Sequence, residues 1–140
     1  MLNQEVILGA DLTDKVQSCK NLMTVMVVED EPLIRSIFAE ELRERGLCVI
    51  EAASGDEAWR ILRAGIVVDF VFSDIVMPGS IDGNELARRL NAADPTVKIL
   101  LASGNSAASP DVKIEHFLQK PYQPYLAIDI ILRSLGLIRP

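Results

Sequence analysis

The stretch from Val68 to Gly79 constrains the fold more than any other part of the chain. It reads Val-Asp-Phe-Val-Phe-Ser-Asp-Ile-Val-Met-Pro-Gly. Its valines and phenylalanines predict a strand that is buried on both faces and that delivers the carboxylate of Asp74 at its carboxyl end. The proline and glycine that follow force the chain out of the strand and into a loop. A carboxylate in this place either caps the next turn or is a reactive group.

Strand-like and helix-like segments alternate along the chain from residue 24 onward. Strands are expected at residues 25–28, 47–50, 68–74, 97–102 and 117–118, and helices follow the first three and the last of them. Between the fourth and fifth strands, Pro110 delays any helix until about Asp111, so that only a turn or two fits before His116. This alternation predicts a flavodoxin-like three-layer α/β/α sandwich with a five-stranded parallel sheet in the order 2-1-3-4-5.

The length of 140 residues is that of about one domain. Residues 1–22 show no sustained period, and we expect them to be an N-terminal extension with a short helix near residues 12–22. Residues 23–140 form the expected domain, and Met23 is a candidate for the authentic start. The two cysteines, Cys19 and Cys48, have neither a disulfide framework nor a metal-binding spacing, so we expect free thiols in a reducing compartment.

The charge balance restricts the partners of the chain. Twenty acidic residues against fourteen basic residues give a net charge of -6, which argues against nucleic acid or an anionic membrane as the main partner. No apolar stretch approaches the roughly 18 residues that span a bilayer, and the N-terminus lacks the basic region of a secretory signal. The expected location is therefore the cytoplasm.

Polar side chains end three of the predicted strands at the same edge of the sheet. Glu29 and Asp30 follow the first strand, Asp74 ends the third, and Lys120 follows the fifth. In the expected strand order, the ligand-binding crevice lies between the first and third strands, so the three carboxylates should meet there. Two carboxylates 4 Å apart repel each other by roughly 4 kcal/mol at intermediate dielectric. Lys120 supplies one positive charge, and an oxygen-only site of this kind favours Mg²⁺ as the other.

A purely structural interpretation of these residues remains open. Asp30 is also available as the cap of a helix that begins at Pro32, and Asp74 could simply open a turn. Each of these roles is common for a single aspartate. They do not explain why four charged groups end strands at one edge.

Four ordered segments of the chain resemble the signature motifs of response-regulator receiver domains. They are Val-Val-Glu-Asp-Glu-Pro at residues 27–32, Asp-Ile-Val-Met-Pro-Gly at 74–79, Ala-Ser-Gly at 102–104 and Lys-Pro-Tyr at 120–122. The resemblance covers residues 23–136. It implies a module of two-component phosphorelay signalling that accepts a phosphoryl group from a histidine kinase or a histidine phosphotransferase and that is not an enzyme. The output would go to a downstream protein partner.

The resemblance also implies a role for each motif residue. Asp74 would be the phosphoacceptor, Asp30 a direct Mg²⁺ ligand, Glu29 a ligand acting through water, and the backbone carbonyl of Val76 a further ligand. Lys120 would pair with a phosphoryl oxygen and form a cis peptide with the proline that follows. Ser103 would donate a hydrogen bond to the phosphoryl group. Phe117 stands at the position of a switch aromatic, and the surface that changes would be the fourth helix, the fifth strand and the last helix of the domain.

Two departures from the family pattern and several rival functions bear on this interpretation. The loop Gly79-Ser80-Ile81 is one residue longer than the most frequent form, and the helix expected near Asp111 is short. The main alternative is an interaction-only pseudo-receiver that binds a partner without phosphorylation. A Mg²⁺-dependent hydrolase would need a second acid where Val76 stands, and a flavin-binding protein would need a phosphate loop where the acidic run at residues 29–31 stands.

Overall fold

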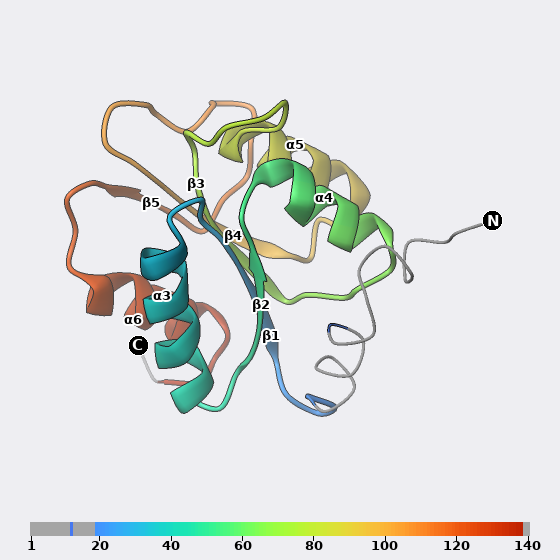
Figure 1. Cartoon of the computed structure of the whole chain (residues 1–140), viewed down its shortest axis with the longest axis vertical. Coiled ribbons are helices and arrows are strands. Elements are labelled where there is room, and N and C mark those ends of the chain that lie inside the picture. The colour runs from blue at the N-terminus through green and yellow to red at the C-terminus, as the bar shows by residue number, and fades with distance from the viewer. Residues whose placement is uncertain (1–11, 13–18, 139–140) are drawn as a thin grey trace.

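The computed structural model describes Leu12 and residues 19–138, which form a parallel sheet with helices on both faces (Figure 1). The elements in chain order are β1 (Thr24–Val28), α3 (Pro32–Glu44), β2 (Cys48–Ala52), α4 (Gly55–Arg63), β3 (Phe70–Asp74), α5 (Gly83–Ala93), β4 (Lys98–Ser103), β5 (His116–Gln119) and α6 (Pro124–Ser134). All neighbouring strands are parallel, in the order β2-β1-β3-β4-β5. The predicted flavodoxin-like sandwich is therefore confirmed. Most of the short helix expected near residues 12–22 lies outside the described residues.

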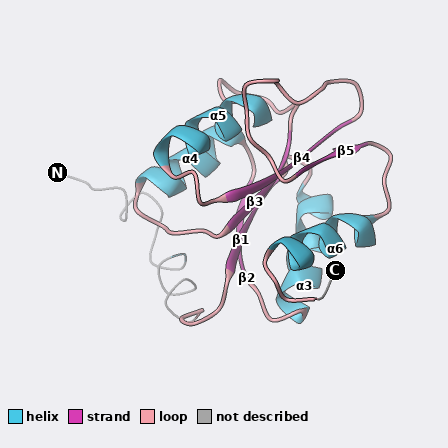
Figure 2. Ribbon diagram, turned by 180° about the vertical axis from the view of Figure 1, so that it is seen from behind, coloured by secondary structure: helices cyan, strands magenta, loops and turns pink. Residues whose placement is uncertain are grey.

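The two faces of the sheet bury two separate hydrophobic clusters because side chains alternate along each strand. In β1, Met26 and Val28 join the cluster beneath α4 and α5, whereas Val25 and Val27 join the cluster beneath α3 and α6. Figure 2 shows the same division, with one pair of helices on each side of the sheet. All five residues of β1 are buried. The sheet is thus a rigid base for whatever side chains lie at its carboxyl edge.

Local capping explains where two of the helices begin. The hydroxyl of Ser54 accepts a hydrogen bond from the N–H of Glu57 at 3.1 Å, and the Glu57 carboxylate accepts one from the N–H of Ala53 at 2.7 Å. This reciprocal pair starts α4 as the Ser-x-x-Glu pattern of residues 54–57 indicates. Asp82 caps α5 with a single bond, because its carboxylate accepts the N–H of Glu85 at 2.8 Å.

The helix expected between the fourth and fifth strands is absent. The structure describes all of residues 104–115, and they form turns and irregular backbone. Polar side chains on one face of α5 occupy the backbone groups of this segment. Asn84 bonds the carbonyl of Ala107 and the N–H of Ser109, and Asn91 bonds both backbone groups of Lys113. These bonds satisfy backbone groups that a helix would otherwise pair internally, so the segment packs without one.

The expectation of two free thiols is also wrong. Cys19 and Cys48 form a disulfide, with their Cα atoms 5.5 Å apart. The N–H of Cys48 donates to the carbonyl of Met23, which brings the residues before β1 beside the start of β2. A separation of 29 residues in the chain gave no indication of this contact. None of the described helices has the length and hydrophobicity needed to cross a lipid bilayer.

Candidate functional site

Three acidic side chains meet at the carboxyl edge of the sheet. Glu29 and Asp30 follow β1, Asp74 ends β3, and one oxygen from each lies within 4.8 Å of the others. Glu29 and Asp74 are buried, whereas Asp30 is exposed. Parallel pairing of β1 with β3 produces this arrangement, because Val28, the last residue of β1, lies opposite Ser73, so that Glu29 and Asp74 come next on neighbouring strands. The sequence-based expectation that topology brings these carboxylates together agrees with the structure.

Asp30 does not cap the helix that follows it. Pro32 occupies the first helical position of α3, so the residue at the N-cap is Glu31, and no side-chain capping bond forms there. The capping role that the sequence left open for Asp30 is therefore wrong. Its carboxylate is left to the acidic cluster.

Lys120 supplies the positive charge of the site. Its Nζ atom lies 3.0 Å from Oδ1 of Asp74, and the Asp74 side chain is only 10% exposed. The N–H of Lys120 donates to the carbonyl of Ser103, which ties the end of β5 to the end of β4. The peptide between Lys120 and Pro121 is cis. One lysine thus faces a cluster of three carboxylates, and the cluster keeps an excess of negative charge.

Burial and the neighbouring carboxyl groups both affect the pKa of Glu29. Burial raises the pKa of Glu29 to about 7, and the neighbouring carboxyl groups of Asp74 and Asp30 add to the rise. The hydrogen bond that the Glu29 carboxylate accepts from the N–H of Glu31, at 3.0 Å, opposes it. Burial, followed by the charges of Asp74 and Glu29, also raises the pKa of the Tyr122 hydroxyl. A hard divalent cation would relieve the repulsion, and a set of carboxylate oxygens is the donor set that such ions prefer.

The remaining predicted site residues lie around Asp74. Ser103 ends β4 and is buried, and its hydroxyl accepts a hydrogen bond from the N–H of Ser106 at 3.1 Å. Val76 lies two residues after Asp74 in the loop between β3 and α5, with its side chain exposed. Phe117 on β5 is partly buried against the cluster beneath α4 and α5. All of these positions are at or near the carboxyl edge of the sheet.

Arg35 is a site neighbour that the sequence did not reveal. Its Nη1 atom donates to the backbone carbonyl of Glu29 at 2.7 Å, and its Nε atom lies 3.4 Å from the carboxylate of Glu51 on β2. The guanidinium therefore fixes the backbone that carries the acidic pair after β1. Its position in the first turn of α3 was the only signal in the sequence.

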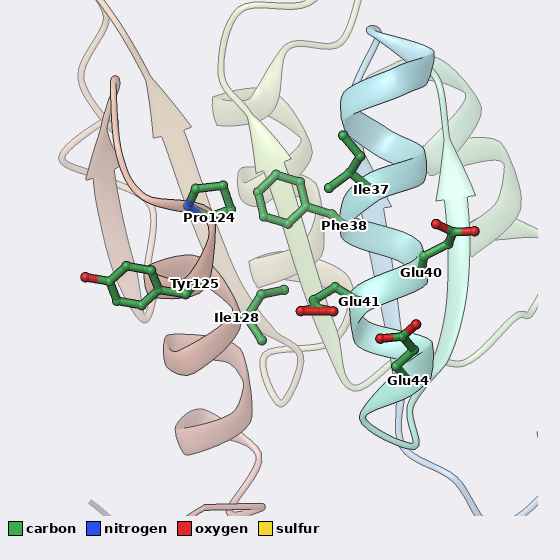
Figure 3. Close-up of a pocket in the computed structure, with 8 residues that line it drawn as sticks. All are labelled: Ile37, Phe38, Glu40, Glu41, Glu44, Pro124, Tyr125 and Ile128. Carbon is green, nitrogen blue, oxygen red and sulfur yellow. The ribbon is translucent and has the colours of Figure 1, made fainter.

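An apolar groove adjoins the charged site. It has a volume of about 490 Å³ and is lined by Glu29 and Lys120 together with apolar residues of α3 and of the chain before α6. Ile34 and Ile37, which fit the apolar period of α3, are exposed on this side. Figure 3 shows the neighbouring pocket between α3 and α6, with Ile37, Glu41 and Glu44 on α3 and Tyr125 on α6. We call the groove and this pocket together the α3/α6 face. Its residues include Ile34, Ile37, Glu40, Glu41, Glu44 and Tyr125.

The comparisons with known proteins agree with this arrangement. Residues 25–131 match the family described as the response regulator receiver domain. The chain is 41% identical over 92 residues to the sensor kinase CckA of Brucella abortus, which covers 65% of this chain and 10% of the kinase. The structure of the receiver domain from the hybrid histidine kinase CckA is 33% identical, with a TM-score of 0.66, over 80% of this chain and 98% of that one. A response regulator receiver protein from Sinorhizobium medicae is 28% identical, with a TM-score of 0.73, over 83% and 96% of the two chains. The chain spans less than half the length of the curated relatives that it matches.

Proposed function

The chain belongs to the response regulator receiver domain family of two-component signalling, and from this premise we propose that Asp74 accepts a phosphoryl group from a phosphohistidine. The observation that carries the proposal is the pairing of a buried Asp74 with Lys120 at 3.0 Å inside a cluster of three carboxylates. A structural ion pair alone does not account for the two further acids, because they raise the electrostatic cost of the site.

The transfer step follows from this geometry. An oxygen of the ionised Asp74 carboxylate forms a bond to phosphorus while the bond from phosphorus to the donor histidine nitrogen breaks, and the nitrogen keeps the electron pair. Lys120 stays beside the reacting oxygens and neutralises the charge that spreads over the phosphoryl group. The Ser103 hydroxyl donates a hydrogen bond to the same group. The chain acts here as a phosphoacceptor, and we propose no separate substrate for it.

Glu29, Asp30, Asp74 and the backbone carbonyl of Val76 would hold Mg²⁺. When bound, the ion would neutralise part of the negative charge of the carboxylates and of the incoming phosphoryl group. The acidic cluster with its raised pKa at Glu29 supports this assignment, because an excess of buried negative charge needs a counterion. Arg35 supports the site from outside by holding the Glu29 backbone in place.

The donor protein would dock on the α3/α6 face. Glu29 and Lys120 line the same groove as Ile34 and Ile37, so a partner that covers the apolar residues also reaches Asp74. Glu40, Glu41 and Glu44 line the adjoining pocket (Figure 3). This combination favours a partner with an apolar helical surface flanked by basic residues, which is a suitable form for a histidine kinase or a histidine phosphotransferase. Such a relay operates in the cytoplasm, where the kinase has ATP.

The output would arise through Ser103. When its hydroxyl turns toward a phosphoryl group on Asp74, it gives up the hydrogen bond that it accepts from the N–H of Ser106. Ser106 lies near the beginning of the irregular segment after β4. Phe117, partly buried nearby on β5, can then shift into the space that Ser103 leaves. Because residues 104–115 contain no helix, the surface presented to a downstream protein consists of this segment, β5 and α6.

The decisive experiment measures intact mass after incubation with acetyl phosphate and Mg²⁺. Wild type should gain one phosphoryl group, and Asp74→Asn should gain none. Asp129→Asn, which changes an exposed carboxylate paired with Arg133 on α6, is the matched control and should behave as wild type. Equal gain by wild type and Asp74→Asn would show that Asp74 is not the acceptor. If wild type gains nothing, the interaction-only pseudo-receiver becomes the better interpretation.

A further inference from the structure

Backbone hydrogen bonds tie the first residue of the loop between β3 and α5 to β4 and to the start of α5. The N–H of Ile75 donates to the carbonyl of Ala102 at 2.9 Å, and the N–H of Gly83 donates to the carbonyl of Ile75 at 2.8 Å. Gly83 also packs so closely on the backbone of Asp74 that there is no room for a Cβ atom. The base of the loop is therefore fixed next to the phosphoacceptor. The tip of the loop, which carries the additional residue, needs a separate anchor.

Asp56 in the first turn of α4 supplies that anchor. Its carboxylate accepts hydrogen bonds from both the N–H of Ser80, at 2.9 Å, and the Ser80 hydroxyl. Gly79 has a φ of 101° and lies against Oδ2 of Asp56, so that a side chain there would collide with the carboxylate. Next to this contact, the backbone carbonyl of Ile81 lies against Gly55 with no room for a Cβ atom. The tip is thus seated on the start of α4.

We call the two hydrogen bonds from Ser80 to the Asp56 carboxylate the clamp. The carboxylate forms them in its ionised state. Hydrogen bonds from the Ser80 hydroxyl and N–H hold the pKa of Asp56 below its usual value. Its position at the start of α4 also suits a negative charge, because free N–H groups point outward there. Hydrogen bonds to an ionised acceptor are stronger than those between neutral groups.

We propose that Asp56 is a positioning residue that acts through Ser80 to hold the backbone of Val76 against the acidic cluster. The proposal rests on the proposed function, in which the Val76 carbonyl is a metal ligand. Val76 itself is 60% exposed, so its side chain contributes little to fixing it, and Met77 is the buried residue between it and the tip. Without the bonds to Ser80, Val76 would be held by the base of the loop and by the packing of Met77 and Ile81. The clamp therefore restricts the part of the loop that must face the site.

The test compares Mg²⁺ binding, measured by isothermal titration calorimetry, with the rate of phosphoryl uptake from acetyl phosphate, measured by intact mass. Asp56→Ala should weaken Mg²⁺ binding and slow uptake by about three- to tenfold, since it removes two hydrogen bonds to a charged acceptor. Asp56→Asn should restore most of both, because its amide can accept from the Ser80 N–H and donate to the hydroxyl. Ser80→Ala removes the hydroxyl but keeps the backbone N–H that donates to Asp56, so its effect should be smaller than that of Asp56→Ala, and the double variant should be no worse than Asp56→Ala alone.

Asp94 offers a matched control. Its carboxylate accepts the N–H of Thr96 at 3.1 Å and the Thr96 hydroxyl at 2.6 Å, in the same two-bond pattern, but it lies at the opposite edge of the sheet before β4. Asp94→Ala should leave Mg²⁺ binding and uptake as in wild type. If Asp56→Ala matches Asp94→Ala in both measurements, the positioning role is refuted. A wild type that binds Mg²⁺ but takes up no phosphoryl group refutes the proposed function, and the Mg²⁺ titrations of the variants then still decide the role of Asp56. A wild type that does neither refutes both proposals.

Discussion

Replacing Glu29 with glutamine tests whether the acidic cluster costs stability when no cation is present. The pKa of Glu29 is raised from 4.5 to about 7, so the folded state keeps a proton that the unfolded chain releases at lower pH. The stabilisation that comes from this bound proton is fully present below pH 4.5 and is lost as the pH rises through 7. A rise of this size corresponds to about 3 kcal/mol. Screening by solvent at the edge of the sheet reduces the expected effect to about 1–2 kcal/mol.

Urea unfolding with a chelator at low ionic strength, at intervals between pH 4 and pH 8, measures this effect. Glutamine is uncharged throughout and still accepts the hydrogen bond from Glu31, so Glu29→Gln should gain about 1–2 kcal/mol relative to wild type between pH 4 and pH 8. Glu40→Gln on the exposed side of α3 is the control and should show no such trend. At pH 8, Mg²⁺ at ten times its dissociation constant should stabilise wild type by about 1.4 kcal/mol. Parallel pH profiles for wild type and Glu29→Gln would contradict the reasoning.

Two further predictions concern Lys120 and the disulfide. Lys120→Ala removes the cation 3.0 Å from Asp74, and it should slow phosphoryl uptake from acetyl phosphate by roughly 10- to 100-fold in an intact-mass time course; an unchanged rate would exclude Lys120 from the transfer step. Breaking the Cys19–Cys48 bond opens a closed loop of about 30 residues, so a reductant should lower the free energy of unfolding of wild type in urea by up to about 3.6 kcal/mol, whereas Cys48→Ser should not respond to reductant. The absence of any difference between oxidised and reduced wild type would mean that the cross-link does not restrict the unfolded chain.

The geometry of the site was predictable because it depends on topology more than on detailed packing. Once strands and helices alternate, parallel strands place their carboxyl ends at one edge, and Asp74 and Lys120 follow from the strand order alone. The pairing of Lys120 with Asp74 and the grouping of Asp74 with Glu29 and Asp30 agree with that expectation. The chemical roles of these residues remain predictions that the experiments above address.

The features that could not be predicted depend on contacts between distant segments. A helix near Asp111 was a reasonable expectation from local pattern, but Asn84 and Asn91 hold the backbone of that segment from α5. Arg88 adds to this hold through the carboxylate of Asp111 at 2.8 Å. Because these partners are more than 20 residues apart in the chain, local propensity was overridden by tertiary hydrogen bonds. The disulfide between Cys19 and Cys48 was missed for the same reason.

Apolar and aromatic residues at helical spacing are not all buried. Ile34 and Ile37 follow the apolar period of α3, and Tyr125 follows that of α6, yet the three side chains are exposed at 41%, 53% and 69%. Period identifies the apolar side of a helix but not the width of the stripe that the sheet covers. Ile34 and Ile37 line the groove with Glu29 and Lys120, and Tyr125 lines the adjoining pocket, which is why these residues belong to a proposed docking surface instead of the core.

The described carboxyl groups whose pKa is shifted fall into two groups, and the difference separates scaffold from site. Hydrogen bonds to hydroxyl and N–H groups lower the pKa of Asp56 and Asp94, and arginine partners lower the pKa of Glu85. These carboxylates gain from ionisation in the folded state, so each stabilises the segment that it holds. Glu29 is the opposite case, since its pKa is raised and its ionisation opposes folding. Ionising a buried carboxylate beside two others costs free energy of folding. A cation that binds only the ionised form can offset that cost. The charges that the fold leaves uncompensated therefore mark where a cation and a phosphoryl group are expected to bind, and the compensated ones, Asp56 among them, hold the surrounding loops in position.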